Sequence, residues 1–298
     1  MNYLITGGTG LIGKALVNSL NTTNNTITVF TRDIDKASSL FNNEIKCIDS
    51  LLPSHLENID TVINLAGEPI AERRWSHNQK HRICESRWDI TEKLSHLISI
   101  AKKPPSLFIS GSAIGIYGRQ GNKPIDENFS NYHKEFTHEV CSKWEQIALE
   151  ASSKYTRVAI LRTGIVLDRK SGALAKMLLP FKLGLGGKVG KGDQYMSWIH
   201  LQDMISAILH IIDIKTLNGP INITSPNAVT NEVFSKKLST ELHRPCLFNT
   251  PPALLKLMFG EMADLLLFGQ NVVPQALLTS GFEYKYAELA NAFDDLLK

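Results

Sequence analysis

The chain opens with a glycine pattern that directly follows a short apolar segment. Residues 6–13 read Thr-Gly-Gly-Thr-Gly-Leu-Ile-Gly, after Tyr3-Leu4-Ile5 and before a stretch over 11–20 with apolar residues at helical spacing. A strand, a glycine turn and a helix in this order are typical of folds that bind a dinucleotide. The sequence therefore predicts a dinucleotide site at its N-terminus.

The three regularly spaced glycines each have a physical role in such a turn. Gly7 permits a tight turn out of the strand, and Gly10 lets the backbone approach a pyrophosphate at the helix N-terminus. Gly13 allows the helix to pack closely on the strand. We expect the turn to bind the cofactor through these glycines together with Thr9, Leu11 and Ile12.

The first half of the chain alternates β-rich runs with helical stretches, which is the pattern of a parallel sheet covered on both faces. The expected strands are 3–6, 26–31, 61–65, 106–110 and 158–162, and the expected helices are 11–20, 76–101 and 134–153. Pro104-Pro105 ends the long helix before the fourth strand. We predict an α/β class protein with a doubly wound parallel sheet, the NAD(P)-binding Rossmann fold.

The pattern changes after Leu167. A glycine-rich loop over 182–192 is long enough to close over a ligand, and a helix near 202–213 and a strand near 220–223 follow. From about residue 231 the chain reads as helical, with prolines between the helices. We expect a dinucleotide-binding domain over 1–230, with a substrate-side loop insertion near 168–200, and a smaller, mostly helical domain over 231–298 at the carboxyl edge of the sheet.

Bulk composition excludes several classes of protein. The net charge of +3, without a block of basic residues, argues against nucleic-acid binding, and the four cysteines lack the spacing of a zinc site. The longest apolar stretch, 254–268, is interrupted by charged residues and cannot span a bilayer. Because Leu4 already belongs to the first expected strand, we expect no signal segment before it. We expect a cytoplasmic protein with a small-molecule substrate and with no metal, nucleic acid or membrane partner.

The second strand ends in Thr31-Arg32, where a dinucleotide fold holds the adenosine ribose. An acidic residue at this point favours the 2′-hydroxyl of NAD, whereas an arginine suits the 2′-phosphate of NADP. A solvated surface arginine is the alternative. We expect NADP (NADPH) as the cofactor.

The next two strands end in small residues. The third runs into Asn64-Leu65-Ala66-Gly67, which lets the chain pass beneath adenine and ribose, and the fourth runs into Ser110-Gly111-Ser112-Ala113. The Ser112 hydroxyl would face the nicotinamide and hydrogen-bond a substrate carbonyl or alcohol. Ordinary packing of strand ends and turns remains the alternative for both.

Taken together, these elements resemble the extended short-chain dehydrogenase/reductase superfamily. They are most similar to its atypical epimerase-like branch, which joins this fold to a C-terminal domain of unknown function. Stretches similar to that branch are 66–75, 86–87, 140–145, 183–187, 198–203, 222–231, 260–264, 269–270 and 280–282. The resemblance implies NADP held by the glycine turn, Thr31, Arg32, Leu65, Ala66 and Arg87, unless Arg87 is only a surface cation. It also implies relatives named as nucleoside-diphosphate-sugar epimerases.

The sequence departs from that superfamily at its catalytic helix. Classical members place a tyrosine four residues before a lysine, which lowers the pKa of the phenol. Here Glu139 precedes Lys143 by four residues. No tyrosine lies between Tyr132 and Tyr155. Tyr117 is the nearest phenol in a plausible location, and we take Ser112, Tyr117 and Lys143 as catalytic candidates. Lys143 would touch the ribose or be solvated, while Glu139 and Glu145 are alternative carboxylate bases or surface residues.

Two further groups are candidates for substrate binding. Arg73, Arg74 and Trp75 follow the third strand and would grip an anionic or planar substrate, or else form a rim of salt bridges. Trp198 and His200 follow the glycine-rich loop, and His200 would serve in acid–base chemistry or as a buried structural histidine.

These observations support two functional hypotheses. The first is an NADP-dependent oxidoreductase or epimerase acting on a small hydroxylated or nucleotide-linked substrate, without the usual Tyr-x-x-x-Lys pair. The second is a catalytically weak NADP-binding protein with a regulatory or redox-sensing role. Extended relatives often dimerise through helices that flank the sheet, and the sequence leaves a homodimer open.

Overall fold

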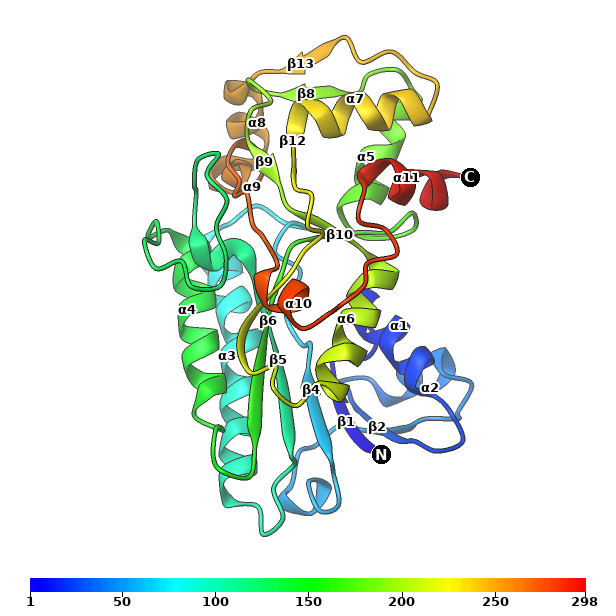
Figure 1. Cartoon of the computed structure of the whole chain (residues 1–298), viewed down its shortest axis with the longest axis vertical. Coiled ribbons are helices and arrows are strands. Elements are labelled where there is room, and N and C mark those ends of the chain that lie inside the picture. Colours follow the sequence, from blue (N-terminus) through cyan, green and yellow to red (C-terminus); the bar gives the residue numbers. More distant parts are fainter.

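A computed structural model describes all 298 residues of the chain, and its centre is a seven-stranded parallel sheet (Figure 1). The strand order is β3-β2-β1-β4-β5-β6-β11. The strands are β1 (Asn2–Thr6), β2 (Thr26–Phe30), β3 (Lys46–Ile48), β4 (Thr61–Asn64), β5 (Leu107–Ala113), β6 (Arg157–Thr163) and β11 (Gly219–Ile223). The order reverses direction at β1 and β4, the switch point where this class of fold binds its ligands.

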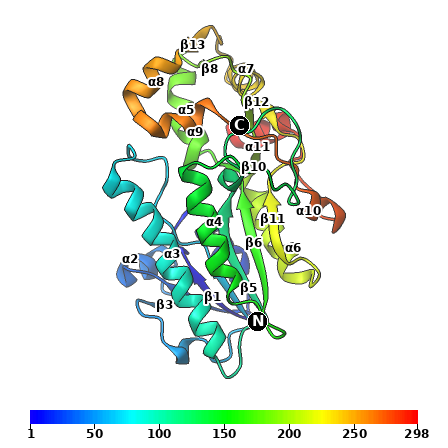
Figure 2. The ribbon, with the colours of Figure 1, turned by 90° about the vertical axis from the view of Figure 1, so that its left-hand side faces the viewer.

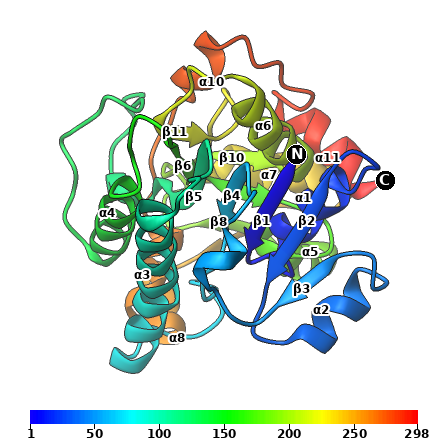
Figure 3. The ribbon, with the colours of Figure 1, turned by 90° about the horizontal axis from the view of Figure 1, so that it is seen from below.

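Helices cover both faces of the sheet, as Figure 3 shows in a view from below. On one face, α1 (Leu11–Leu20) and α6 (Leu201–Asp213) bury Leu16, Val17 and Ile208 in a core of 26 residues. On the other, α3 (His77–Ile100) and α4 (Phe136–Leu149) bury side chains such as Leu94 and Ala148. The predicted doubly wound fold is confirmed.

Two elements near the N-terminus were not predicted. The short helix α2 (Ile34–Leu40) and the strand β3 of three residues lie between β2 and β4. In the turn between α2 and β3, Asn42 and Asn43 adopt positive φ. Asparagines therefore form this turn, and no glycine or proline marks it in the sequence.

The remaining elements form a lobe beyond the carboxyl ends of the strands, which Figure 2 shows from a second side. A core of 12 residues joins side chains of 167–198, such as Phe181 and Trp198, to Phe234 and Phe293 of the C-terminal region. The lobe elements are β7 (Ile165–Leu167), α5 (Gly172–Lys182), β8 (Gly187–Val189), β9 (Tyr195–Met196), β10 (Trp198–His200), β12 (Val229–Thr230), α7 (Asn231–Glu241), β13 (Phe248–Thr250), α8 (Pro252–Phe259), η3 (Gly260–Ala263), α9 (Asp264–Leu267) and α11 (Leu289–Leu297). Helix α10 (Gln275–Thr279) is the exception: it packs beside β11, and its Leu277 belongs to the core of 26 residues. None of the helices in the chain combines the length and the apolarity needed to cross a bilayer.

Candidate functional site

The glycine turn between β1 and α1 packs so tightly that two of its positions exclude a side chain. Gly7 has φ +67°, and a Cβ there would lie 2.5 Å from the carbonyl carbon of Leu65. A Cβ at Gly13 would lie 2.2 Å from the Gly7 carbonyl oxygen. Glycine is therefore required at Gly7 and Gly13 by close contact between the turn, helix α1 and the end of β4.

The N-terminus of α1 has backbone donors without side-chain acceptors. Its N-cap residue is Gly10, which provides no capping side chain, and no acidic residue lies in the first turn. The first N–H groups of a helix have no partner within the helix and carry the positive end of its dipole. This end of α1, with Thr9, Leu11 and Ile12, suits a diphosphate.

Arg32 lies just beyond the end of β2, next to an acidic residue that is already engaged. Asp33 caps α2, because its carboxylate accepts a hydrogen bond from the Lys36 N–H at 3.0 Å. The Asp33 N–H donates to the Thr31 hydroxyl at 3.2 Å. Arg32 is exposed and makes no side-chain hydrogen bond or ion pair within the chain. The guanidinium is free to bind an anion, whereas the carboxylate beside it is held by the helix.

A second guanidinium without a carboxylate partner lies at the end of β4. A Cβ at Gly67 would lie 3.1 Å from Arg87 Cζ, so the two residues are in contact. Arg87 Nη1 donates to the Ile83 carbonyl at 2.9 Å, and its guanidinium lies 5.3 Å from the Trp144 ring centroid. Burial lowers the pKa of Arg87, partly opposed by nearby Cys141, Cys84 and Glu68. An anionic ligand would relieve this cost of burying an unpaired cation.

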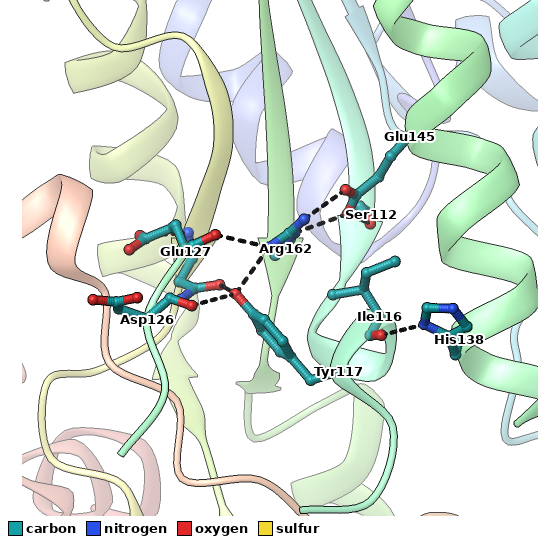
Figure 4. A network of polar contacts seen from close by, with 9 residues as sticks. Ser112, Ile116, Tyr117, Asp126, Glu127, His138, Glu145 and Arg162 are labelled. Carbon is teal, nitrogen blue, oxygen red and sulfur yellow. Dashed lines mark hydrogen bonds and ion pairs between the residues drawn. The ribbon is translucent and has the colours of Figure 1, made fainter. Parts of the chain in front are cut away.

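Ser112 near the end of β5 belongs to a buried ion-pair network (Figure 4). Its hydroxyl donates to Glu145 Oε1 at 2.7 Å. Arg162 of β6 holds the same carboxylate through Nε to Oε1 at 2.9 Å and Nη2 to Oε2 at 2.8 Å. Because a carboxylate only accepts, the single proton of Ser112 is directed toward Glu145. The Ser112 oxygen therefore offers lone pairs to a ligand.

Tyr117 extends this network away from Ser112. Its side chain is fully buried, and its hydroxyl donates to Asn222 Oδ1 at 2.7 Å and accepts from Arg162 Nη1 at 3.1 Å. Burial raises the pKa of Tyr117 to about 12, although Arg162 and Asn222 oppose the shift. Burial alone would lower the pKa of Arg162, but hydrogen bonds and charge attraction from Glu145 raise it. The phenol is thus held in its neutral form inside the protein.

The face of α4 that points toward β5 does not carry the predicted lysine. Lys143 and Glu139 are exposed, and the Lys143 ammonium lies 4.2 Å from the Trp88 ring centroid on α3. Among the buried residues of α4, Thr137 and Cys141 have the same four-residue spacing and lie on the helix face that also carries Glu145. A Cβ at Gly115 would lie 3.0 Å from Thr137 Cβ and 3.8 Å from Cys141 Sγ.

Neither member of this pair resembles the usual proton shuttle. Burial raises the pKa of Cys141 to about 11, with nearby Glu145 adding to the shift. Sequence reasoning missed Thr137, Cys141 and the role of Arg162 because the lysine was taken as the reference position. The spacing of α4 carries no signal for them, because the inward face of the helix is defined by Glu145, whose burial depends on its ion pair with Arg162.

The residues predicted at the site mouth lie where the C-terminal lobe meets the loop after β4. Arg73 and Arg74 are exposed and form no ion pair, and a Cβ at Gly260 would lie 3.2 Å from Arg74 Nη2. The Trp75 indole N–H donates to the Ile70 carbonyl at 2.9 Å, and its ring packs edge-on against Phe136. The two guanidiniums thus have no carboxylate partner, whereas the Trp75 ring is held in place by Ile70 and Phe136.

Trp198 and His200 lie inside the lobe. Trp198 is fully buried, and its indole N–H donates to the Asn227 carbonyl at 3.1 Å. His200 is the N-cap of α6: Nδ1 accepts from the Gln202 N–H at 3.0 Å, and the ring stacks on Tyr286 at 3.9 Å. Burial lowers the pKa of His200, opposed by Asp295 and Asp203. Neither side chain hydrogen-bonds to the Ser112 network. The contacts of His200 are those of a buried structural histidine.

A parallel sheet of this order with a glycine turn at its switch point defines a dinucleotide-binding α/β protein. Residues 3–224 match the profile of the NAD dependent epimerase/dehydratase family, and residues 250–296 match a domain of unknown function, DUF1731. An epimerase family protein of Staphylococcus aureus (strain N315) is 35% identical over 300 residues, 99% of each chain. The chain belongs to the NAD dependent epimerase/dehydratase family, and the predicted resemblance is confirmed.

Solved structures agree with this assignment. The human epimerase family protein SDR39U1 (isoform 2), crystallised with NADPH, is 31% identical with a TM-score of 0.88, covering 99% of both chains. The nucleoside-diphosphate sugar epimerase from Corynebacterium glutamicum is 28% identical with a TM-score of 0.80, covering all of this chain and 58% of that one. UDP-glucuronic acid 4-epimerase from Bacillus cereus, 15% identical with a TM-score of 0.77 and 99% and 95% coverage, shares the fold.

Proposed function

We propose that this chain is an NADP(H)-dependent oxidoreductase or epimerase acting on a small hydroxylated or nucleotide-linked substrate. The observation that carries the proposal is the pairing of the uncapped N-terminus of α1 with the unpaired Arg32 at the end of β2. The first suits a diphosphate and the second a 2′-phosphate. NADPH in the crystals of the human relative supports the same cofactor.

The cofactor would be held along the carboxyl edge of the sheet. The glycine turn would bind its diphosphate, Thr31 and Arg32 its 2′-phosphate, and Leu65, Ala66 and Gly67 would pass beneath the adenosine. Arg87 contacts Gly67 and would add a positive charge near the diphosphate. When bound, the nicotinamide supplies the hydride or accepts it.

Ser112 is the residue that we place against the substrate. Its proton is directed toward Glu145, so its oxygen would accept a hydrogen bond from a substrate hydroxyl rather than donate one to a carbonyl. Glu145, Arg162 and Tyr117 would act as positioning residues that fix this orientation. Lys143 lies on the outer face of α4 and is left out of the proposed catalytic group.

Hydride transfer in the presence of defined substrates tests the proposal. Purified chain is incubated with NADPH or NADP⁺ and a panel of nucleotide sugars and small hydroxyl and carbonyl compounds, and cofactor oxidation state and sugar configuration are followed. We expect turnover that Ser112→Ala reduces by up to about tenfold, since a single hydrogen bond to the substrate is worth roughly 0.5–1.5 kcal/mol. Lys143→Ala is the matched control and should leave turnover unchanged.

Two outcomes would contradict parts of this proposal. Full turnover in Ser112→Ala would show that Ser112 does not act on the substrate, although the chain would still be an enzyme. NADPH binding without turnover on the whole panel would favour the regulatory or redox-sensing alternative, to which the absence of a Tyr-x-x-x-Lys pair from α4 already points.

A further inference from the structure

Strands β8 and β13 lie at the end of the molecule farthest from the N-terminus (Figure 1). The segments around them carry exposed apolar and basic side chains. We call residues 182–192 and 243–260 the tip. The tip is about a tenth of the chain, yet it holds six of the nine large apolar side chains that are more than half exposed. These six are Leu183, Leu185, Leu247, Phe248, Leu257 and Met258.

The two segments of the tip are fastened to each other. Strands β8 and β13 pair in parallel, with Phe248 opposite Gly187. Arg244 Nε donates to the Lys182 carbonyl at 2.7 Å, and the Gly190 N–H donates to the Thr250 carbonyl at 3.0 Å. The exposed apolar side chains therefore stand on an ordered, hydrogen-bonded support and not on separate loops.

Charge at the tip has a single sign. The tip carries Lys182, Lys188, Lys191, Arg244 and Lys256 and no aspartate or glutamate, so the rest of the chain has two more acidic than basic residues. Among these five cations, only Lys188 forms an ion pair, with Glu232 at 3.7 Å. Positive charge is thus concentrated where the apolar side chains are exposed.

We propose that the tip docks on an anionic lipid surface. Exposed apolar patches of this kind mark interaction sites, and apolar side chains surrounded by lysine and arginine are typical of proteins that lie in the bilayer interface. Acidic headgroups attract the cations, while Leu247, Leu257 and their neighbours enter the boundary of the acyl chains. The site is distinct from the cofactor site and needs no spanning helix.

A second copy of the chain fits this surface less well than lipid does. A twofold interface would place the same patch against itself, so the cations of one tip would face those of the other. The tip offers no carboxylate to balance them. A bilayer containing acidic lipids supplies both the opposite charge and an apolar interior.

Co-sedimentation with vesicles tests the proposal. Full-length chain is mixed with vesicles of phosphatidylcholine alone, or of phosphatidylcholine with phosphatidylglycerol, and pelleted protein is measured. The tip variant is Leu247→Glu/Leu257→Glu, at positions 83% and 75% exposed, where folding is not at risk. The matched control is Ile100→Glu/Tyr155→Glu, which adds the same charge at exposed apolar positions outside the tip.

We expect the wild type to pellet with the acidic vesicles, less so as salt rises, and not with phosphatidylcholine alone. The tip variant should partition at least roughly tenfold more weakly, since it loses two apolar anchors and gains two negative charges. The control should match the wild type, and thermal melts should show all three folded. NADPH titration of the same variants tests the proposed cofactor site separately. A variant that loses vesicle binding should still bind NADPH as the wild type does.

Three results would overturn the proposal. The first is absence of pelleting with acidic vesicles. The second is equal pelleting of the tip variant and the wild type. The third is a concentration-dependent dimer in light scattering that the tip variant abolishes and acidic vesicles do not affect, which would make a second copy the occupant.

Discussion

Breaking the buried pair between Glu145 and Arg162 should destabilise the fold far more than removing both partners. The side chains of Glu145 and Arg162 are only 9% and 4% exposed. The Arg162 guanidinium donates two hydrogen bonds to the Glu145 carboxylate, one to each oxygen. Arg162→Met leaves the carboxylate of Glu145 buried with only the Ser112 hydroxyl as partner. Removing one member of such a pair costs about 3–5 kcal/mol in free energy of unfolding.

Part of that cost disappears in the double variant. Glu145→Gln/Arg162→Met buries no unpaired charge, and replacing a buried ion pair by neutral groups of similar volume is often close to neutral. We expect the double variant to be at least about 2 kcal/mol more stable than Arg162→Met alone, which is the coupling expected for residues in contact. In a chain of this size, a loss of 3–5 kcal/mol lowers the melting temperature by roughly 5–8 °C.

Urea unfolding followed by circular dichroism measures all four members of this cycle. Reversibility and a single transition are checked for each variant, and the slopes are compared to exclude a change in the unfolded state. Free energies of unfolding that add within about 0.5 kcal/mol would refute the reasoning, because the two groups would then not interact. A loss below about 1 kcal/mol in Arg162→Met would do so as well.

Two further predictions concern the glycine turn and the lobe. Gly13→Ala should lose about 1–3 kcal/mol of stability and most NADPH binding, because its Cβ would lie 2.2 Å from the Gly7 oxygen; Gly121→Ala, with no atom within 4 Å of its Cβ, is the control in thermal melts. His200→Asn should reduce the acid sensitivity of unfolding. Burial lowers the pKa of His200, so the unfolded chain binds the proton first and the wild type loses stability as pH falls below about 6.5. Asparagine still caps α6 without titrating, and identical pH profiles of unfolding for both chains would contradict this account.

The sequence predicted the parts of the fold that depend on local patterns. The glycine turn, the strands at the centre of the sheet and helices α3, α4 and α6 were located to within a few residues, because apolar periodicity and proline breaks mark them. Strand β3 was missed because three residues, Lys46-Cys47-Ile48, are too few to show a period. The lobe was expected to be mostly helical, and strands β8 and β13 form only by pairing across about 60 residues.

The site shows the same division. Arg32 is unpaired because the neighbouring carboxylate of Asp33 caps helix α2 by accepting a hydrogen bond from the Lys36 N–H. The sequence alone does not show that a helix begins at this point. Which face of α4 points inward depends on the buried pair of Glu145 with Arg162, a contact between a helix and a strand. Spacing alone could not separate the exposed Glu139 and Lys143 from the buried Thr137 and Cys141.

The central claim is that the end of β2 selects a 2′-phosphate. Calorimetric or fluorescence titration of the wild type, Arg32→Glu and Lys36→Glu with NADPH and NADH tests it most directly. Lys36→Glu reverses the same charge one turn away. We expect NADPH to bind the wild type and Lys36→Glu at least about tenfold more tightly than NADH, and Arg32→Glu to lose that preference, since such a contact is worth roughly 1.5–3 kcal/mol. Equal affinities of the wild type for NADPH and NADH would contradict the claim.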